Sequence, residues 1–122
     1  MDAHELREHC LSFRGAEETF PFGPNTSVFK VAGKMFALSQ LAAESLRVSV
    51  KCEPDLAVAL RQAHPAVLPG YHLNKRHWNT VVIDGSLPDD AVRDMIEDSY
   101  DLVVGMLPRA RRRALGARGE DT

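Results

Sequence analysis

A chain of 122 residues has the common length of one domain, and its 44% hydrophobic residues supply enough apolar area for one core. No apolar run approaches the roughly 18 residues that a membrane-spanning helix requires, which excludes a membrane protein and predicts a soluble one. The formal net charge of −2 excludes a protein coated in positive charge, and two cysteines without CxxC spacing favour reduced thiols in the cytoplasm.

The first predicted element is a helix, and an edge strand follows it. Within Asp2–Phe13, the residues Leu6, Cys10 and Phe13 are spaced by four and then three positions, which places them on one helical face. Residues 17–25 contain two prolines and a glycine, which exclude a long helix. They favour a short edge strand that runs into a turn.

Three further strands are predicted from branched and alternating residues. Ser27–Ala32 and Met35–Leu41 are rich in branched and aromatic side chains, and the Gly33-Lys34 pair between them predicts a tight hairpin. Leu46–Lys51 alternates strictly, so its apolar residues face the core. The opposite side of this strand is positive and hydroxyl-bearing, with Arg47, Ser49 and Lys51.

A second helix is predicted between two prolines. Pro54 opens it, and Pro65 closes it because the residue before a proline avoids helical geometry. The predicted apolar stripe of this helix consists of Leu56, Ala57, Leu60 and Ala63.

Residues 71–82 hold the only tryptophan of the chain among several donors and cations. After a predicted loop over residues 66–70, strands are predicted at Tyr71–Leu73 and Thr80–Asp84, so this stretch wraps a hairpin corner. A large flat ring beside permanent positive charges suits stacking on a base and neutralising a phosphate. It equally suits a hairpin packed on a core, so both interpretations stay open. The residues at the corner are Asn74, Lys75, Arg76, His77 and Trp78.

The third helix is predicted to begin at Ser86, whose hydroxyl can cap it, with Asp89 and Asp90 near the positive end of the helix dipole. Residues 85–107 carry six acidic residues and one arginine, whereas residues 24–81 carry seven Lys or Arg and three acidic residues. This distribution predicts separate negative and positive surfaces. The predicted buried stripe of the helix consists of Val92, Met95, Ile96, Ser99, Val103 and Met106.

The C-terminal part of the chain is predicted to be a short Arg-rich helix that starts at Pro108 and frays into a polar end. We therefore expect a single domain over residues 1–115 and a flexible polar tail over residues 116–122. The basic residues Arg109–Arg113 are open to two interpretations, which are electrostatic contact with nucleic acid and a solubilising end.

The order of the elements predicts an α+β fold, in which an antiparallel β-sheet has helices packed on one face as a two-layer sandwich. The other face of such a sheet is wet and polar. Arg47 and Lys51 would then lie on an exposed platform, which is where proteins of this build often bind.

Five blocks of sequence occur in order along most of the chain: Gly15–Gly23, Val28–Val31, Gly33–Leu38, Tyr71–Val81 and Ser99–Val103. Together they resemble the MmcQ/YjbR family of small bacterial proteins. The resemblance implies a CyaY-like fold, that is a YjbR-type two-layer sandwich, and a DNA-binding role.

We predict that the protein binds DNA without catalysis, by contacting phosphates through a basic and aromatic surface. We expect a cytoplasmic monomer that binds no membrane and requires no cofactor. The prediction depends on Lys75 and Arg76 reaching solvent together with the outward cations of the sheet, as one continuous positive patch. The predicted nucleic-acid-binding residues are Lys34, Arg47, Lys51, Asn74, Lys75, Arg76, His77 and Trp78.

Other classes of function also stay open, and they depend on other residues. The acidic third helix suits a protein-interaction module, and Cys52 or His72 suits a site for a small molecule. Acids three and four residues apart on that helix are also candidate ligands of a hard cation, although their spacing matches no recognised metal motif. The chain has no GxSxG, P-loop or GxGxxG motif, so hydrolase, NTPase and dinucleotide chemistry are unsupported.

Overall fold

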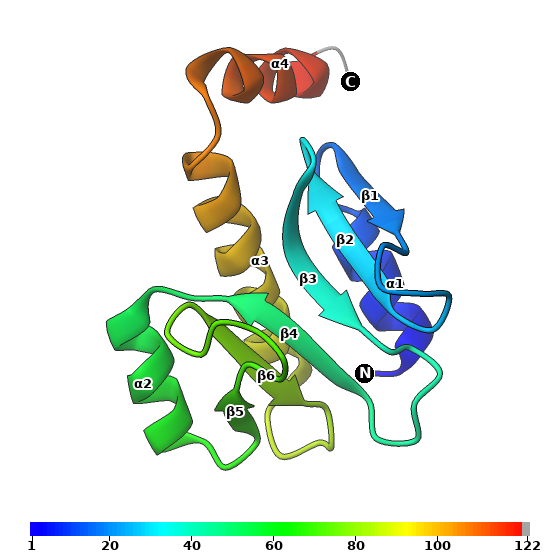
Figure 1. Cartoon of the computed structure of the whole chain (residues 1–122), viewed down its shortest axis with the longest axis vertical. Helices are drawn as coiled ribbons and strands as arrows, with labels where there is room; N and C mark the ends of the chain where they lie inside the picture. The colour runs from blue at the N-terminus through cyan, green and yellow to red at the C-terminus, as the bar shows by residue number, and fades with distance from the viewer. Residues whose placement is uncertain (121–122) are drawn as a thin grey trace.

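The computed structural model describes the backbone of residues 1–120 and the side chains of residues 1–116. Its helices are α1 (Ala3–Leu11), α2 (Pro54–Ala63), α3 (Asp89–Gly105) and α4 (Arg109–Glu120). Its strands are β1 (Ala16–Thr19), β2 (Ser27–Val31), β3 (Lys34–Ser39), β4 (Arg47–Lys51), β5 (Val67–Pro69) and β6 (Trp78–Val82). The strands form one antiparallel sheet in the order β1-β2-β3-β4-β6-β5 (Figure 1).

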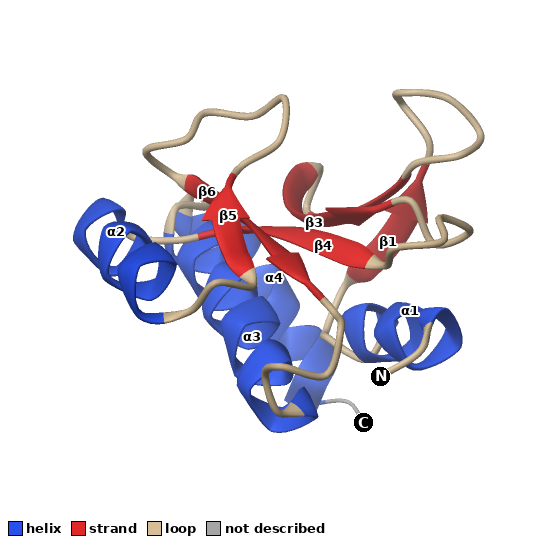
Figure 2. Cartoon of the chain, turned by 90° about the horizontal axis from the view of Figure 1, so that it is seen from below, coloured by secondary structure: helices blue, strands red, loops and turns tan. Residues whose placement is uncertain are grey.

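The predicted two-layer α+β architecture is confirmed. α1 and α3 lie on one face of the sheet, and α2 packs beside β5 and β6 at one edge (Figure 2). We call the other face the open face, because no helix in the described part of the chain lies over it. Any site on the open face is therefore built from strand side chains and from the loops around the sheet.

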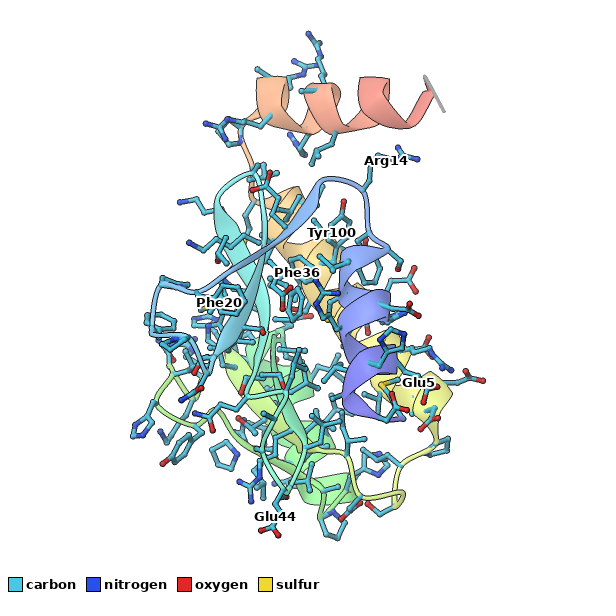
Figure 3. All side chains as sticks on the ribbon, turned by 90° about the vertical axis from the view of Figure 1, so that its right-hand side faces the viewer. Glu5, Arg14, Phe20, Phe36, Glu44 and Tyr100 are labelled. Carbon is cyan, nitrogen blue, oxygen red and sulfur yellow. The ribbon has the colours of Figure 1, made fainter. Side chains whose placement is uncertain are left out.

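The hydrophobic core lies between the sheet and the two helices α1 and α3. The rings of Phe13 and Tyr100 stack with centroids 4.8 Å apart, and Phe36 meets both edge-on at 5.9 Å and 5.3 Å. Figure 3 shows Phe36 and Tyr100 on this side of the sheet and Phe20 on the opposite side. Aromatic contacts therefore join the turn after α1, β3 and α3 in the core.

An irregularity in β3 decides which of its side chains reach the open face. Phe29 lies opposite Ala37 and Lys30 lies opposite Met35, so Phe36 has no partner in β2 and forms a bulge. The bulge resets the alternation of the strand. As a result Phe36 points into the core, whereas Leu38 lines a pocket on the open face.

The predicted hairpin over residues 71–84 is wrong in its first strand. The strand is Val67–Pro69, within the predicted loop, and the predicted strand Tyr71–Leu73 is part of a loop over residues 70–77. The ladder between β5 and β6 ends where the Gly70 N–H donates to the Trp78 carbonyl. His72 then takes a left-handed conformation with φ 57°, which turns the chain away from the sheet.

Three details of the predicted helices are also wrong. Ser86 does not cap α3; its backbone N–H donates to the Asp84 carboxylate at 3.0 Å, and the helix begins two residues after Leu87. Met106, expected in the buried stripe, is 67% exposed beyond the end of α3. In α2 only Ala57 of the predicted stripe is fully buried, and Leu56 is 43% exposed, because α2 packs at the sheet edge rather than under the sheet.

The predicted Arg-rich helix is confirmed as α4, which continues to Glu120 through most of the expected tail over residues 116–122. Residues 121–122 of that tail lie outside the described residues. The Arg111 guanidinium donates to the Ala32 carbonyl at 3.3 Å, and Leu115 is buried, so α4 is attached to the β2–β3 turn. None of the helices described is both long and apolar enough to span a bilayer.

Candidate nucleic-acid interface

The open face carries cations from β4, as the alternation predicts. Val48 and Val50 belong to the core, so Arg47, Ser49 and Lys51 leave the strand on the other side. Their partners across the β4–β6 ladder are Val82, Thr80 and Trp78 respectively. The positive and hydroxyl-bearing side of the strand is therefore presented on the open face.

Two loops rise from the open face, and together with the loop between β3 and β4 they enclose a pocket. Figure 2 shows the loop between β5 and β6 on one side and the loop between β1 and β2 on the other. The pocket has a volume of about 530 Å³. Both loops and the strands between them contribute to its lining, which includes Phe22, Leu38, Arg47, Ser49, Tyr71, His72 and Thr80.

Trp78 does not provide the predicted stacking surface. Its side chain is only 8% exposed, and its Cβ lies so close to Gly70 that a Cβ on residue 70 would approach it to 2.7 Å. A ring buried in this way offers no free face to a base. Its role is to pack at the start of β6, which corrects the prediction for this residue. Tyr71, 67% exposed, is one of the aromatic side chains at the rim of the pocket.

The remaining predicted residues of the corner form the loop over residues 70–77. The Asn74 side chain accepts from the Arg76 N–H at 2.9 Å, and its carbonyl accepts from the N–H groups of His77 and Trp78. Asn74 therefore holds a turn rather than reaching outward. The Lys75 ammonium donates to the Gly70 carbonyl at 3.2 Å across the loop, and the side chain of Arg76 is exposed.

Arg61 and Asn79 anchor this loop, and neither was predicted as a site residue. The Arg61 guanidinium donates to the Lys75 carbonyl at 3.2 Å and to the Asn79 side-chain oxygen at 2.7 Å. The Asn79 amide in turn donates to the Ala57 carbonyl of α2 at 3.3 Å. The sequence did offer one signal for Asn79, which is a polar amide within a strand of mainly apolar residues. A buried amide requires hydrogen-bond partners, so such a residue marks a point where the strand is tied to a neighbouring segment.

Lys34 lies apart from the other predicted residues. It is opposite Val31, whose side chain is in the core, so by register Lys34 leaves the sheet on the side covered by helices. Lys51 and Trp78 are cross-strand neighbours, and Arg47 lies at the far end of the same strand. The predicted patch therefore consists of the open-face and loop cations Arg47, Lys51, Lys75 and Arg76, without Lys34.

The ion pairs in the described part of the chain lie elsewhere. They join Met1 to Asp89, His4 to Glu8, Arg7 to Glu18 and Arg93 to Asp90, all on the helical side. None of them uses the four cations of the patch. Among the described side chains, no carboxylate therefore lies within 4.0 Å of these four cations to neutralise their charge.

A second groove, of about 560 Å³, lies between α2 and α3 on the helical side. Its apolar lining includes Leu56, Leu60, Leu102 and Met106, and its acidic residues are Glu53, Asp98 and Asp101. Lys51, at the end of β4, also lines it. The Cys52 thiol also lines it, and burial together with Asp98 and Glu53 raises the pKa of that thiol. No group of three His, Cys, Asp or Glu side chains positioned to hold a metal ion occurs among the described residues, on α3 or elsewhere.

The fold and the site together define the class of this protein, which is a two-layer α+β sandwich with loops that rise around one open sheet face. The family model described as YjbR matches residues 11–102, and the chain belongs to the YjbR family. It is 38% identical to the uncharacterized protein YjbR of Escherichia coli K12 over 94% of this chain and 98% of the relative. It is 36% identical to the uncharacterized protein YbdF of Escherichia coli O157:H7 over 93% and 97% respectively.

Solved structures support the same assignment. The crystal structure of Deinococcus radiodurans protein DR2400, with a DUF419 domain, superposes with a TM-score of 0.89 at 40% identity, covering 94% of this chain and 88% of that one. A crystal structure of a protein from Pseudomonas syringae gives a TM-score of 0.73 at 26% identity, covering 84% of this chain and 98% of that one. The fold and the family are shared along nearly the whole chain.

Proposed function

We propose that the protein binds nucleic acid through the open face, with phosphates at Arg47, Lys51, Lys75 and Arg76. Three observations support the proposal. Arg47 and Lys51 leave β4 on the side opposite the core residues Val48 and Val50, and Lys75 and Arg76 lie in the loop that rises from the open face. None of the four has a carboxylate partner among the described side chains. Phosphate contacts supply most of the affinity in non-specific nucleic-acid binding. The mechanism is contact, and no step of catalysis is proposed.

The two loops suit this function because they restrict how a ligand approaches. The loop over residues 70–77 carries Lys75 and Arg76, and Arg61 fixes its backbone from α2. A cationic loop that is already held in place loses less conformational entropy on binding. We expect one strand of nucleic acid to run between the loops along the open face.

Replacing both Lys75 and Arg76 by alanine is expected to weaken nucleic-acid binding for every sequence, with little change in melting temperature. The slope of log affinity against log salt should be about −3 to −4 for four neutralised phosphates, and it becomes shallower by nearly one unit for each phosphate that is no longer neutralised. The measurement is a titration of labelled DNA over a series of salt concentrations. The matched control replaces Arg14 and Arg93, two cations on the helical side, and we expect it to leave the slope unchanged.

Unchanged affinity and slope in the Lys75/Arg76 variant would place the site elsewhere. Affinity that does not depend on salt in the unmodified protein would contradict phosphate binding altogether. Circular dichroism melting shows that each variant is folded before it is titrated.

A second candidate function is docking of a protein segment in the groove between α2 and α3. Leu56, Leu102 and Met106 are exposed there by 43%, 37% and 67%, which is unusual for large apolar side chains next to one another. Carboxylates of Glu53, Asp98 and Asp101 stand beside them. This combination favours an amphipathic helix with leucine on one face and lysine or arginine at its flanks.

The rate of chemical modification of the Cys52 thiol tests this second function. Cys52 lines the groove and is 8% exposed, whereas Cys10 is 0% exposed and burial together with Glu18 raises its pKa to about 12. We expect a short helical peptide of leucine and lysine to slow maleimide modification of Cys52 several-fold. A peptide with glutamate in place of lysine is the control and should give no protection. Equal rates with both peptides would contradict docking by charge complementarity.

A further inference from the structure

The floor of the open-face pocket offers one hydroxyl hydrogen to a ligand. The Ser49 and Thr80 hydroxyl oxygens are 2.8 Å apart, and the Tyr71 backbone N–H donates to the Thr80 oxygen at 3.0 Å. Only one of the two hydroxyls donates to the other. Whichever does so, the hydrogen of its partner stays available, because each hydroxyl has a single donor hydrogen.

The rim of the pocket carries exposed aromatic rings on both sides. Tyr71 is 67% exposed and Phe22 is 65% exposed, and they belong to the two different loops that wall the pocket. The apolar side chain of Leu38 lies in the lining between them. Large rings that stay in water around a pocket are typical of sites that stack planar ligands.

Arg47 adds a cation to the same pocket. It lines the cavity with Ser49 and Thr80, its side chain is exposed, and no ion pair of the described part occupies it. A guanidinium of this kind presents a planar set of donors to a phosphate. The pocket therefore combines an anion contact, a hydrogen-bond donor and aromatic rings within one cavity of about 530 Å³.

We propose that this pocket receives one unstacked nucleotide, so that the protein binds single-stranded nucleic acid in preference to duplex. The base stacks against Tyr71 with Phe22 on the opposite rim, an acceptor atom of the base meets the free hydroxyl hydrogen, and the adjoining phosphate meets Arg47. A base within a duplex is stacked and paired, and it cannot enter the pocket without being extruded. This inference rests on the proposed function and specifies the ligand of the same site.

The test compares labelled oligothymidylate with a duplex of the same length at one salt concentration. We expect the single strand to bind about tenfold more tightly, in line with the contribution of one base stacked on an aromatic ring. Tyr71→Ala should remove this preference by weakening single-strand binding, with duplex binding unchanged. Tyr71→Phe keeps the ring and should keep the preference.

A second readout follows the pocket itself. The mononucleotide dTMP is expected to shift the amide NMR signals of Ser49, Tyr71 and Thr80 in the unmodified protein, and not those of α3. Equal affinity for both DNA forms, with no effect of Tyr71→Ala, would overturn the nucleotide pocket and leave phosphate binding by the open face intact. Absence of binding to either form would overturn the proposed function and this inference together.

Discussion

Replacing Ser99 by alanine is expected to lower the free energy of unfolding by about 2–4 kcal/mol, because it removes the partner of one buried and one part-buried backbone group. The Ser99 hydroxyl accepts from the Lys51 N–H at 2.8 Å and donates to the Phe36 carbonyl at 2.6 Å. The side chain is fully buried. Alanine leaves both backbone groups without a partner at the place where the bulge in β3 interrupts regular pairing.

Thermal and urea denaturation measure this effect, and the expected fall in melting temperature is about 10 °C. Ser12→Ala is the matched control, because the Ser12 hydroxyl donates to the His9 carbonyl at 2.6 Å in an exposed position. Water replaces that bond, so a change below about 0.5 kcal/mol is expected. Equal stability of the two variants would show that the hydroxyl of Ser99 does not hold α3 to the sheet.

Ser99 also illustrates what the sequence predicts well and what it does not. Helical spacing placed Ser99 correctly in the buried stripe of α3 together with Val92, Ile96 and Val103. Spacing cannot identify the partners of its hydroxyl, since these lie 48 and 63 residues away in the chain. Periodicity reports which face of an element is buried, and it carries no information on long-range hydrogen bonds.

The outward face of β4 was predictable for the same reason. Strict alternation over Leu46–Lys51 fixes which residues leave each side of the strand, and the structure places Arg47 and Lys51 as expected. Lys34 was wrongly included in the positive patch. Its side of the sheet depends on the register of the β2–β3 hairpin, in which Lys34 lies opposite the core residue Val31.

The exposed aromatic ring was expected at Trp78, but the structure exposes Tyr71 instead. Trp78 and Tyr71 both lie near the cations in the chain, and composition alone does not distinguish a buried ring from an exposed one. The sequence did not show where β5 ends. In the structure, Gly70 follows β5 and packs against Trp78, and the next residue, Tyr71, then lies at the rim of the pocket. That pairing brings together strands separated by a loop, and local sequence patterns do not determine its register.

Replacing Gly70 by alanine is expected to destabilise the protein by about 2–3 kcal/mol and to weaken nucleic-acid binding as much as the loss of Lys75 and Arg76 does. An added Cβ would lie 2.7 Å from the Trp78 Cβ and 2.8 Å from the Trp78 carbonyl oxygen. The second contact is with backbone, which cannot move aside as a side chain does. The ends of β5 and β6 must separate, and the loop over residues 70–77, with Lys75 and Arg76, then moves out of its position.

The only tryptophan of the chain reports this change directly. Since Trp78 is 8% exposed, its fluorescence in the folded Gly70→Ala protein should shift to longer wavelength as water reaches the ring. Gly105→Ala is the matched control, because no heavy atom lies within 4 Å of an added Cβ at that position in α3. Alanine favours the helix there by up to about 1 kcal/mol, so the stability of the Gly105→Ala protein should be equal or higher. Its nucleic-acid binding should be unchanged, because the substitution does not touch the loop over residues 70–77. If a folded Gly70→Ala protein with shifted fluorescence bound nucleic acid as tightly as the unmodified protein, binding would not depend on the position of the loop, and this prediction would be wrong.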